Sequence, residues 1–391
     1  MSFSQEVLIP ALQARRLLCQ DVLKSHQQAL ARINQKPLHD WAVSLGDHLI
    51  FDFSGLNVIK NALQSYQGTA DQLNFKLQLS EPAIRDYYSH STYLASDGLI
   101  NLPIIATRNL NRNEEVDTYL LTFDELSTPI NYPQALTERD VNSTPLALLM
   151  PYSCDHDLLF SNQIALFSNI NQQVRKSPRS WLNAFFKRRT LFKGRNISLN
   201  QRISLSWKQV HPSADVHPTA VIEGSVIGEG CRVGAHCVVR YSLLGNNVHL
   251  HDGAKVEYSV LDDNSWLMHD LVLYRSLAET DVFLIHGPYQ FSFFQKGSGA
   301  FANIMMDYRP DNKPIRINTP INKPSGVCDY QGRFLGALLE ERAKVFGGTL
   351  TAPGITIPHD KQITADIDAI TTAKTLAGKA LKESLIKSIK F

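Results

Sequence analysis

A regular internal repeat constrains this 391-residue chain more than any other feature of its sequence. From Val210 onward, aliphatic residues follow one another in steps of six, six and five, so equivalent positions recur after every three steps. These positions are Val210, Ile227, Leu244, Leu261 and Ala278. A serine two positions earlier keeps the same period, at Ser225, Ser242, Ser259 and Ser276. Internal repeats with a fixed period of this kind indicate stacked units rather than a single globular core.

Three short strands per turn, each with one inward aliphatic side chain, make a triangular coil. Stacked coils bury a continuous apolar column and pair their backbone groups with the coils above and below. Glycine and asparagine follow the inward residue, as in Leu244-Gly245-Asn246, where tight corners require them. This pattern is that of the hexapeptide repeat, and it predicts a left-handed parallel β-helix of seven or more coils over residues 207–360.

The repeat is expected to break within this region. Residues 279–335 depart from the register with several aromatic residues and a polar excursion, Asp307-Tyr308-Arg309-Pro310-Asp311-Asn312-Lys313-Pro314. The register resumes at Leu339, Val345, Thr351 and Ile357. Loops that leave a rigid scaffold often carry function, so the excursion is a candidate site.

The rest of the chain predicts a different organisation. Residues 1–155 are typical of a mixed α/β domain, with an opening helix over 5–33 and strands over 47–53 and 118–123. Residues 156–206 predict a helical, basic connector, and residues 361–391 a tail that ends in a helix. The fold class is therefore a mixed α/β domain followed by a parallel β-helix and a C-terminal helix.

A basic stretch over residues 175–195 has two interpretations. It carries eight lysines and arginines, no acidic residue and four interleaved aromatic residues. Such a segment is able to lie on an anionic membrane surface or to contact nucleic acid. We favour a connector whose aromatic residues pack on a neighbouring domain, because the chain's net charge is only +2. Membrane-surface contact remains an alternative, and no nucleic-acid partner is expected.

Hydropathy and cysteine usage favour a cytoplasmic protein. No apolar run reaches the length of a membrane span, and the N-terminus lacks the pattern of a secretory signal. The five cysteines are scattered and contain no Cys-x-x-Cys pair, so the sequence supports neither a disulfide framework nor a structural zinc site.

Three segments resemble a known family. Residues 307–315 are similar to the Asn-x-Arg-x-Asp-Gly-Lys-Pro-Val excursion of sugar-phosphate nucleotidyltransferases that also acetylate, such as N-acetylglucosamine-1-phosphate uridyltransferases. Residues 333–357 resemble the closing coils of that family, and Asp157-Leu158-Leu159-Phe160-Ser161-Asn162 its Asp-Leu-Leu-x-x-Asn junction between domains. The resemblance implies an acetyl-CoA-dependent acyltransferase that acts on a sugar or sugar nucleotide, and a homotrimer with active sites between subunits.

The first half of the chain departs from that family. A Gly-x-Gly turn that brings backbone N–H groups to nucleotide phosphates is missing from residues 1–155. Nucleotidyl transfer is therefore not expected, and residues 1–155 are either a degenerate nucleotidyltransferase-like domain or an unrelated one.

The resemblance implies a set of site residues. A general base must take a proton from the acceptor amine or hydroxyl, and His286 lies where the family carries its catalytic histidine. Its alternative role is a corner residue hydrogen-bonded to the next coil. The candidate substrate- or cofactor-binding residues are Asp307, Tyr308, Lys313, Arg316, Arg333 and Lys344. Asp307 replaces an asparagine of the family, which weakens its assignment.

Two further hypotheses compete with acyl transfer. Asp252, His269 and His286 are each one full repeat apart and should stack on one edge, where histidines at a subunit interface are able to hold zinc. The sequence does not favour that site, and we assign no metal. The alternative function is a non-catalytic scaffold that binds a sugar nucleotide or a protein partner, which exposed aromatic residues at Tyr289, Phe291, Phe293 and Phe294 would favour.

Overall fold

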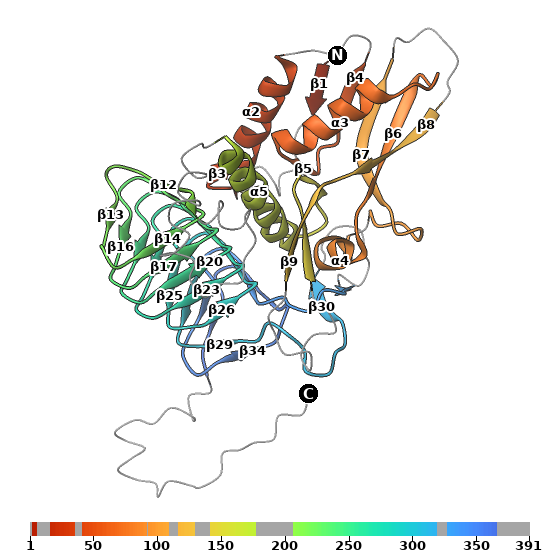
Figure 1. The fold of residues 1–391 in the computed structure, drawn as a ribbon. Coiled ribbons are helices and arrows are strands. Elements are labelled where there is room, and N and C mark those ends of the chain that lie inside the picture. Colours follow the sequence, from red (N-terminus) through yellow and green to blue (C-terminus); the bar gives the residue numbers. More distant parts are fainter. Residues whose placement is uncertain are drawn as a thin grey trace, which may run out of the picture.

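The computed structural model describes residues 2–5, 16–35, 41–91, 93–108, 116–129, 141–176, 206–318 and 327–365. A mixed α/β region precedes a parallel β-solenoid, and the helix α5 (His156–Arg175) lies between them (Figure 1). The predicted fold class, an α/β domain followed by a parallel β-helix, is confirmed. The predicted C-terminal helix lies outside the described residues.

The solenoid is built from three parallel sheets, which we name by their first strands. The β12 sheet contains β12 (Lys208–Val210), β15 (Ser225–Ile227), β18 (Leu243–Leu244), β21 (Val260–Leu261), β24 (Leu277–Ala278), β27 (Phe293–Phe294), β32 (Leu338–Leu339) and β35 (Thr356–Ile357). The β13 sheet contains β13 (Asp215–Val216), β16 (Arg232–Val233), β19 (His249–Leu250), β22 (Trp266–Leu267), β25 (Phe283–Ile285), β28 (Gly299–Phe301), β33 (Lys344–Val345) and β36 (Gln362–Ile363). The β14 sheet contains β14 (Val221–Glu223), β17 (Val238–Arg240), β20 (Lys255–Glu257), β23 (Val272–Tyr274) and β26 (Tyr289–Gln290). A separate pair, β29 (Ile304–Met305) and β34 (Leu350–Thr351), follows the β14 sheet along the solenoid.

Strand register confirms the predicted repeat. The predicted equivalent residues pair directly, Val210 with Ile227, Ile227 with Leu244, and so on to Ala278. The serines form a buried ladder along the corner that leads into β15, β18, β21 and β24. The backbone N–H of Ser259 donates to Oγ of Ser242 at 3.1 Å, and that of Ser276 to Oγ of Ser259 at 3.0 Å. The serine period thus supplies hydrogen bonds where the chain turns.

The predicted interruption begins too early in the sequence. The coil continues through β25 to β29, and only residues between β29 and β32 leave it. One turn is shorter than the others, because Ala278 pairs with Phe294, one position before the one that the repeat predicts. Tyr289, Phe293 and Phe294 are buried, so they do not form the exposed aromatic surface that would favour the scaffold hypothesis. Aromatic side chains fill the interior here in place of aliphatic ones, and this disguises the repeat. The resumption at Leu339 is confirmed by its pairing with Phe294.

The α/β region is built on a mixed five-stranded sheet. Its strand order is β1 (Ser2–Gln5), β4 (Ala42–Leu45), β7 (Ile100–Thr107), β6 (Gln72–Gln78) and β8 (Val116–Thr122). β7 runs antiparallel to both of its neighbours, whereas the outer pairs β1–β4 and β6–β8 are parallel. Helices α2 (Val22–Asn34) and α3 (Phe53–Ser65) lie beside this sheet (Figure 1) and contribute to its core.

Smaller elements complete this region. The pairs are β2 (Arg16–Leu17) with β3 (Gln20–Asp21), β5 (Leu49–Phe51) with β11 (Leu149–Pro151), and β9 (Glu125–Pro129) with β10 (Val141–Pro145). A short helix α4 (Glu81–Ala83) continues into the π-helical turn η1 (Ile84–Tyr88). The strand predicted over 118–123 corresponds to β8, and the one over 47–53 is shortened to β5 because Asp52 caps α3 through the N–H of Gly55 at 2.9 Å.

The opening helix predicted over 5–33 is interrupted at residues 16–21, and residues 6–15 lie outside the described part of the chain. α2 begins at Val22, after β2 and β3 have formed a tight hairpin at Leu18 and Cys19. Both turn residues have a positive φ, 48° and 62°, which a helix does not accommodate. The apolar spacing that predicted one long helix therefore spans a turn as well.

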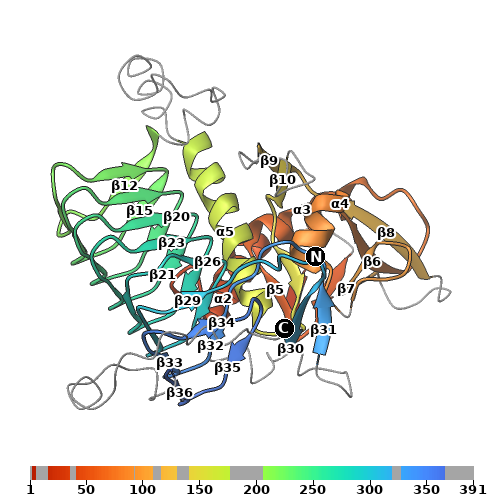
Figure 2. The ribbon, with the colours of Figure 1, turned by 90° about the horizontal axis from the view of Figure 1, so that it is seen from below.

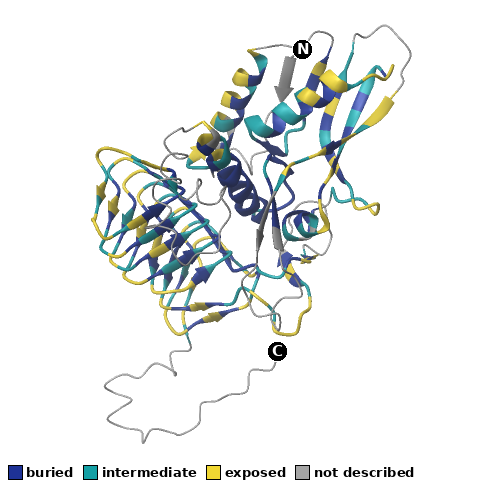
Figure 3. Ribbon diagram, in the orientation of Figure 1, coloured by how far each residue is buried: buried dark blue, intermediate teal, exposed yellow. Residues whose placement is uncertain are grey.

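α5 joins the two regions into one core. Its residues are almost all buried, as its dark colour in Figure 3 makes visible. Val260, Leu277 and Phe293 of the β12 sheet belong to the same hydrophobic cluster as the α/β core, and Figure 2 shows α5 between the two parts. The predicted helical connector is thus a buried helix up to Arg175. The rest of the connector, with nearly all of the basic stretch, lies outside the described residues.

The insertion between β29 and β32 reaches back to the α/β region. It forms a hairpin of β30 (Ile315–Asn318) and β31 (Val327–Tyr330), whose Ile315, Ile317 and Tyr330 are buried in the α/β core. The Tyr330 hydroxyl donates to the carbonyl of Asp86 at 2.8 Å. Within the described residues, no helix combines the length and apolar character needed to cross a membrane.

Candidate functional site

His286, the predicted base, lies at an exposed corner of the solenoid. It follows β25 and precedes β26, and its φ of 62° is the left-handed conformation that tight corners require. Five of the chain's thirteen histidines occupy this same corner on successive coils. We name this row the histidine edge: His217, His236, His251, His269 and His286. All but His251 are exposed, so a substrate could contact their imidazoles.

An aromatic row runs along the outer face of the β13 sheet beside this edge. It consists of His249, Trp266, Phe283, Phe301 and Phe346. The His249 and Trp266 rings stack at 4.0 Å between centroids, and those of Phe301 and Phe346 at 5.1 Å. Trp266 and Phe283 remain 41% and 36% exposed. A flat aromatic surface of this kind suits ring stacking and apolar chains.

Lys344 is the one predicted binding residue on this face. It lies on β33 and pairs with Gly299, which in turn pairs with Phe283, so Lys344 and the aromatic row share one sheet. Its side chain is partly exposed. His286 directly follows β25 of the same sheet. The structure therefore places His286 and Phe283 on one coil, and Lys344 two coils further along the same sheet.

The remaining predicted binding residues lie on the insertion, at a different corner of the coil. Two contacts join the ends of the insertion. The N–H of Leu335 donates to the carbonyl of Asp307 at 2.7 Å, and Tyr308 forms a β-bridge with Phe334. Burial raises the pKa of the Asp307 carboxyl. Arg333 is partly exposed.

Two basic residues of the insertion lie against acids of the insertion itself. Lys313 and Arg316 each have 73% of their side chains exposed, facing Asp311 at 3.8 Å and Asp329 at 4.0 Å. Exposed pairs of this kind contribute little stability and leave the cations open to solvent. The insertion leaves the coil after β29, whereas His286 lies between β25 and β26, so the sequence-predicted set divides between two corners.

Residues of the stacked zinc site considered from the sequence make other contacts within the described part of the chain. Asp252 uses Oδ1 to accept the N–H of Ala235 at 2.7 Å, which fixes a coil corner. His269 instead contacts His251, with 4.8 Å between ring centroids. Among the described residues, the one group of three metal-type ligands lies elsewhere.

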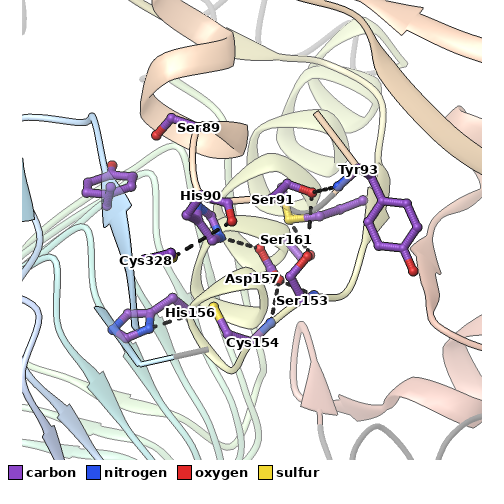
Figure 4. Close-up of polar contacts among 12 residues, drawn as sticks. Ser89, His90, Ser91, Tyr93, Ser153, Cys154, His156, Asp157, Ser161 and Cys328 are labelled. Atoms are coloured by element: carbon purple, nitrogen blue, oxygen red, sulfur yellow. Dashed lines mark hydrogen bonds and ion pairs between the residues drawn. The ribbon is translucent and has the colours of Figure 1, made fainter. Parts of the chain in front are cut away.

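That group is a buried polar cluster at the start of α5, drawn in Figure 4. Asp157 accepts from the backbone N–H groups of Ser153 and Cys154 at 2.5 and 2.8 Å, which satisfies two buried donors in the turn before the helix. Its other oxygen lies 2.7 Å from Nε2 of His90. One ligand atom each of His90, Cys154 and Asp157 lie within 4.8 Å of one another.

Burial sets the protonation of this cluster. It raises the pKa of the Cys154 thiol well above its usual value and lowers that of His156 to about 4. At neutral pH the cluster therefore contains a thiol and a neutral His156.

Asp157 was noticed in the sequence only as part of a junction motif. Its partner His90 lies 67 positions earlier in the chain, so the sequence does not show that the two residues meet. The run Cys154-Asp155-His156-Asp157 is nevertheless a local signal, because all four residues are of types that bind metals.

A buried arginine lies at the same junction between solenoid and α5. Arg275 is 6% exposed, its Nε has no hydrogen-bond partner, and it forms no ion pair among the described residues. Its guanidinium faces the rings of Tyr258 and Phe291, at 5.5 and 6.0 Å. The same corner position is occupied on successive coils by Tyr241, Tyr258, Arg275 and Phe291. Cation–π contacts offset part of the cost of burying its charge.

Comparisons with known proteins give matches only among solved structures. No family model matches the chain, and no curated protein sequence does. A GDP-perosamine N-acetyltransferase from Caulobacter crescentus, solved with CoA and GDP-perosamine, is 12% identical over 40% of this chain and 53% of its own, with a TM-score of 0.18. A hexapeptide transferase family protein from Anaplasma phagocytophilum is 14% identical over 40% and 74%, with a TM-score of 0.19. The acetyltransferase domain of PglB from Neisseria gonorrhoeae is 16% identical over 41% and 55%, with a TM-score of 0.12.

These matches are distant. This chain spans about half the length of the perosamine and PglB proteins. The assignment of a hexapeptide-type solenoid rests on the strand registers of this chain itself.

Proposed function

We propose that this protein is an acyltransferase that moves an acyl group from a coenzyme A thioester, most simply acetyl-CoA, to a sugar or sugar nucleotide. The observation that carries the proposal is the exposed imidazole of His286, on one face with the aromatic row and Lys344. The hexapeptide-type coil and the resemblance of residues 307–315 and 333–357 support the same class. The acceptor and the acyl chain are not specified by these features.

In this mechanism, the acceptor amine or hydroxyl attacks the thioester carbonyl carbon. His286 takes the proton that the acceptor loses, the carbon–sulfur bond breaks, and the proton passes to the departing coenzyme A thiolate. The aromatic row offers a surface for the adenine ring or the pantetheine chain. Lys344 offers a charge for a phosphate. Asp307, Tyr308, Lys313, Arg316 and Arg333 stay predicted contacts of the substrate or the cofactor.

Calorimetric titration with acetyl-CoA tests the donor, and a matched pair of variants tests the base. We expect saturable binding by the wild type, and binding without turnover for His286→Ala, whose rate with a responsive acceptor should fall by about 10²–10⁴-fold. His236→Ala is the control, because His236 is exposed on the same edge three coils away. No heat at millimolar acetyl-CoA would contradict the proposal, as would equal losses in the two variants.

A homotrimer is part of this proposal, because the resembled family usually trimerises with sites between subunits. Light scattering should then give three times the 43.9 kDa mass of the chain. A monomeric mass for an active protein would contradict this.

One observation favours the second candidate, a non-catalytic scaffold that binds a sugar nucleotide or a protein. The insertion, where the resembled family places acceptor contacts, is used for docking on the α/β region. The N–H of Gln331 donates to Oγ of Ser89 at 2.9 Å, beside the Tyr330–Asp86 bond. Saturable binding of a sugar nucleotide, together with no binding of any acyl-CoA, would select this scaffold function.

A further inference from the structure

The buried cluster at the start of α5 brings together three kinds of metal ligand. His90 follows η1, Cys154 follows β11, and Asp157 lies in the first turn of α5. Sulfur, imidazole nitrogen and carboxylate oxygen within 4.8 Å of one another make a set that zinc-class metals prefer. A tetrahedral zinc ion holds such atoms roughly 3–4 Å apart, so the side chains need shift by only about an ångström.

Two ring nitrogens in this cluster have no partner within the described part of the chain. His90 and His156 are each 2% exposed, and Nδ1 of His90 and Nε2 of His156 make no hydrogen bond there. The His90 nitrogen that faces the other ligand-type atoms is Nε2, which lies 2.7 Å from Oδ1 of Asp157. His156 also lies beside the thiol, with Nδ1 4.0 Å from Sγ of Cys154. Each of the two histidines therefore presents one ring nitrogen to the other ligand-type atoms of the cluster, Nε2 in His90 and Nδ1 in His156.

The burial of Cys154 decides between a nucleophilic site and a structural metal site. A cysteine beside a histidine and an aspartate is also the arrangement of a nucleophilic enzyme. A nucleophile must meet its substrate, and Cys154 is fully buried. Structural metal sites are closed and need no such access. The insertion also meets the cluster, because Sγ of Cys328 lies 3.9 Å from the carbonyl of His90.

We propose that this cluster is a structural metal site of the zinc class, with Cys154, His90 and Asp157 as ligands and His156 as the available fourth. Binding converts the Cys154 thiol into a metal-bound thiolate and releases its proton to solvent. The ion would fix the start of α5 to the segment after η1, at the point where the insertion docks. This site is independent of acyl transfer at the histidine edge.

Metal analysis of the untagged full chain, purified without chelators, tests the site. We expect about one zinc ion per chain in the wild type, and less than about one tenth of that in Cys154→Ser. Cys237→Ser is the matched control, since Cys237 is equally buried but lies within the solenoid core. It should keep the wild-type content.

Cobalt substitution gives a second measurement that reports on the ligand itself. A thiolate-to-cobalt absorption band in the near ultraviolet should form in the wild type and in Cys237→Ser, and be absent from Cys154→Ser. A folded wild-type protein that takes up neither zinc nor cobalt overturns the proposal. A cobalt band that survives in Cys154→Ser overturns it too. The wild-type measurements decide the matter even where Cys154→Ser fails to fold.

Discussion

The solenoid and the α/β region are stabilised by contacts of very different reach along the chain. In the solenoid, backbone and side-chain bonds join positions one repeat apart, as between Ser242 and Ser259, so each coil pairs with the coils next to it. In the α/β region, the N–H of Leu18 donates to Oδ1 of Asn162, 144 positions away, at 2.8 Å. The buried residues of the solenoid therefore recur at a fixed period in the sequence, whereas those of the α/β region do not.

The largest expected effect comes from comparing one core phenylalanine in each region. Phe294 in the solenoid and Phe51 in the α/β region are both fully buried, so replacing either with alanine should lower the free energy of unfolding by about 3–5 kcal/mol. Hydrogen exchange should distinguish them. Phe294→Ala should weaken protection in the coils of β24, β27 and β32 and spare β13 to β17, whereas Phe51→Ala should weaken the whole α/β region. Uniform loss in both variants would contradict this difference.

Acid should weaken the α/β region through His26. Burial lowers the pKa of His26 to about 3, and its Nε2 accepts the N–H of Phe51 at 3.2 Å. The folded state holds this proton more weakly than the unfolded chain does. Its contribution is therefore complete above about pH 6.5 and is lost as the pH falls toward 3.

Denaturant titrations between pH 6.5 and 4 should measure a loss of about 3 kcal/mol assignable to His26. His26→Gln keeps an acceptor for the Phe51 N–H without titrating, so its stability should fall less over this range. Other titrating groups are common to both proteins and cancel in the difference. Parallel pH profiles for the two proteins would show that His26 does not contribute.

The smallest expected effect is a gain at the boundary between the two regions. Arg275 interrupts a row of corner tyrosines, and its buried charge has no counter-ion among the described residues. Arg275→Tyr extends that row and should raise the free energy of unfolding by about 2 kcal/mol. Arg342→Tyr, at an exposed arginine paired with Asp360, should change it by less than about 0.5 kcal/mol. A loss for Arg275→Tyr would mean that the rings of Tyr258 and Phe291 stabilise the cation more than burial costs.

The sequence predicts the solenoid well because its information is redundant. Each coil repeats the positions of the last, so Ile227 or Leu244 alone is not needed to find the period. The prediction failed at Tyr289 and Phe294, where aromatic residues fill the interior and one turn is shorter than the rest. It also failed at Leu18 and Cys19, where a hairpin precedes α2 within an apparently helical pattern.

Site residues in the solenoid were easier to place from the sequence than those in the α/β region. The corner position of His286 follows from the repeat, while its role as a base stays a prediction. The group of His90, Cys154 and Asp157 could not be found, because a fold without internal repeats brings distant segments together by packing alone. The sequence also did not show that His286 and the insertion lie at different corners of the coil. The reason is that the repeat could not be followed beyond Ala278.

The hairpin inserted between β29 and β32 also sets the order in which the protein can mature. The α/β region is synthesised first, yet part of its core, including Ile315, Ile317 and Tyr330, is supplied by residues made after most of the solenoid. At about 5–20 residues per second, the ribosome delivers this hairpin on the order of 10 s after α5. The region that is synthesised first is thus the last to have its core completed.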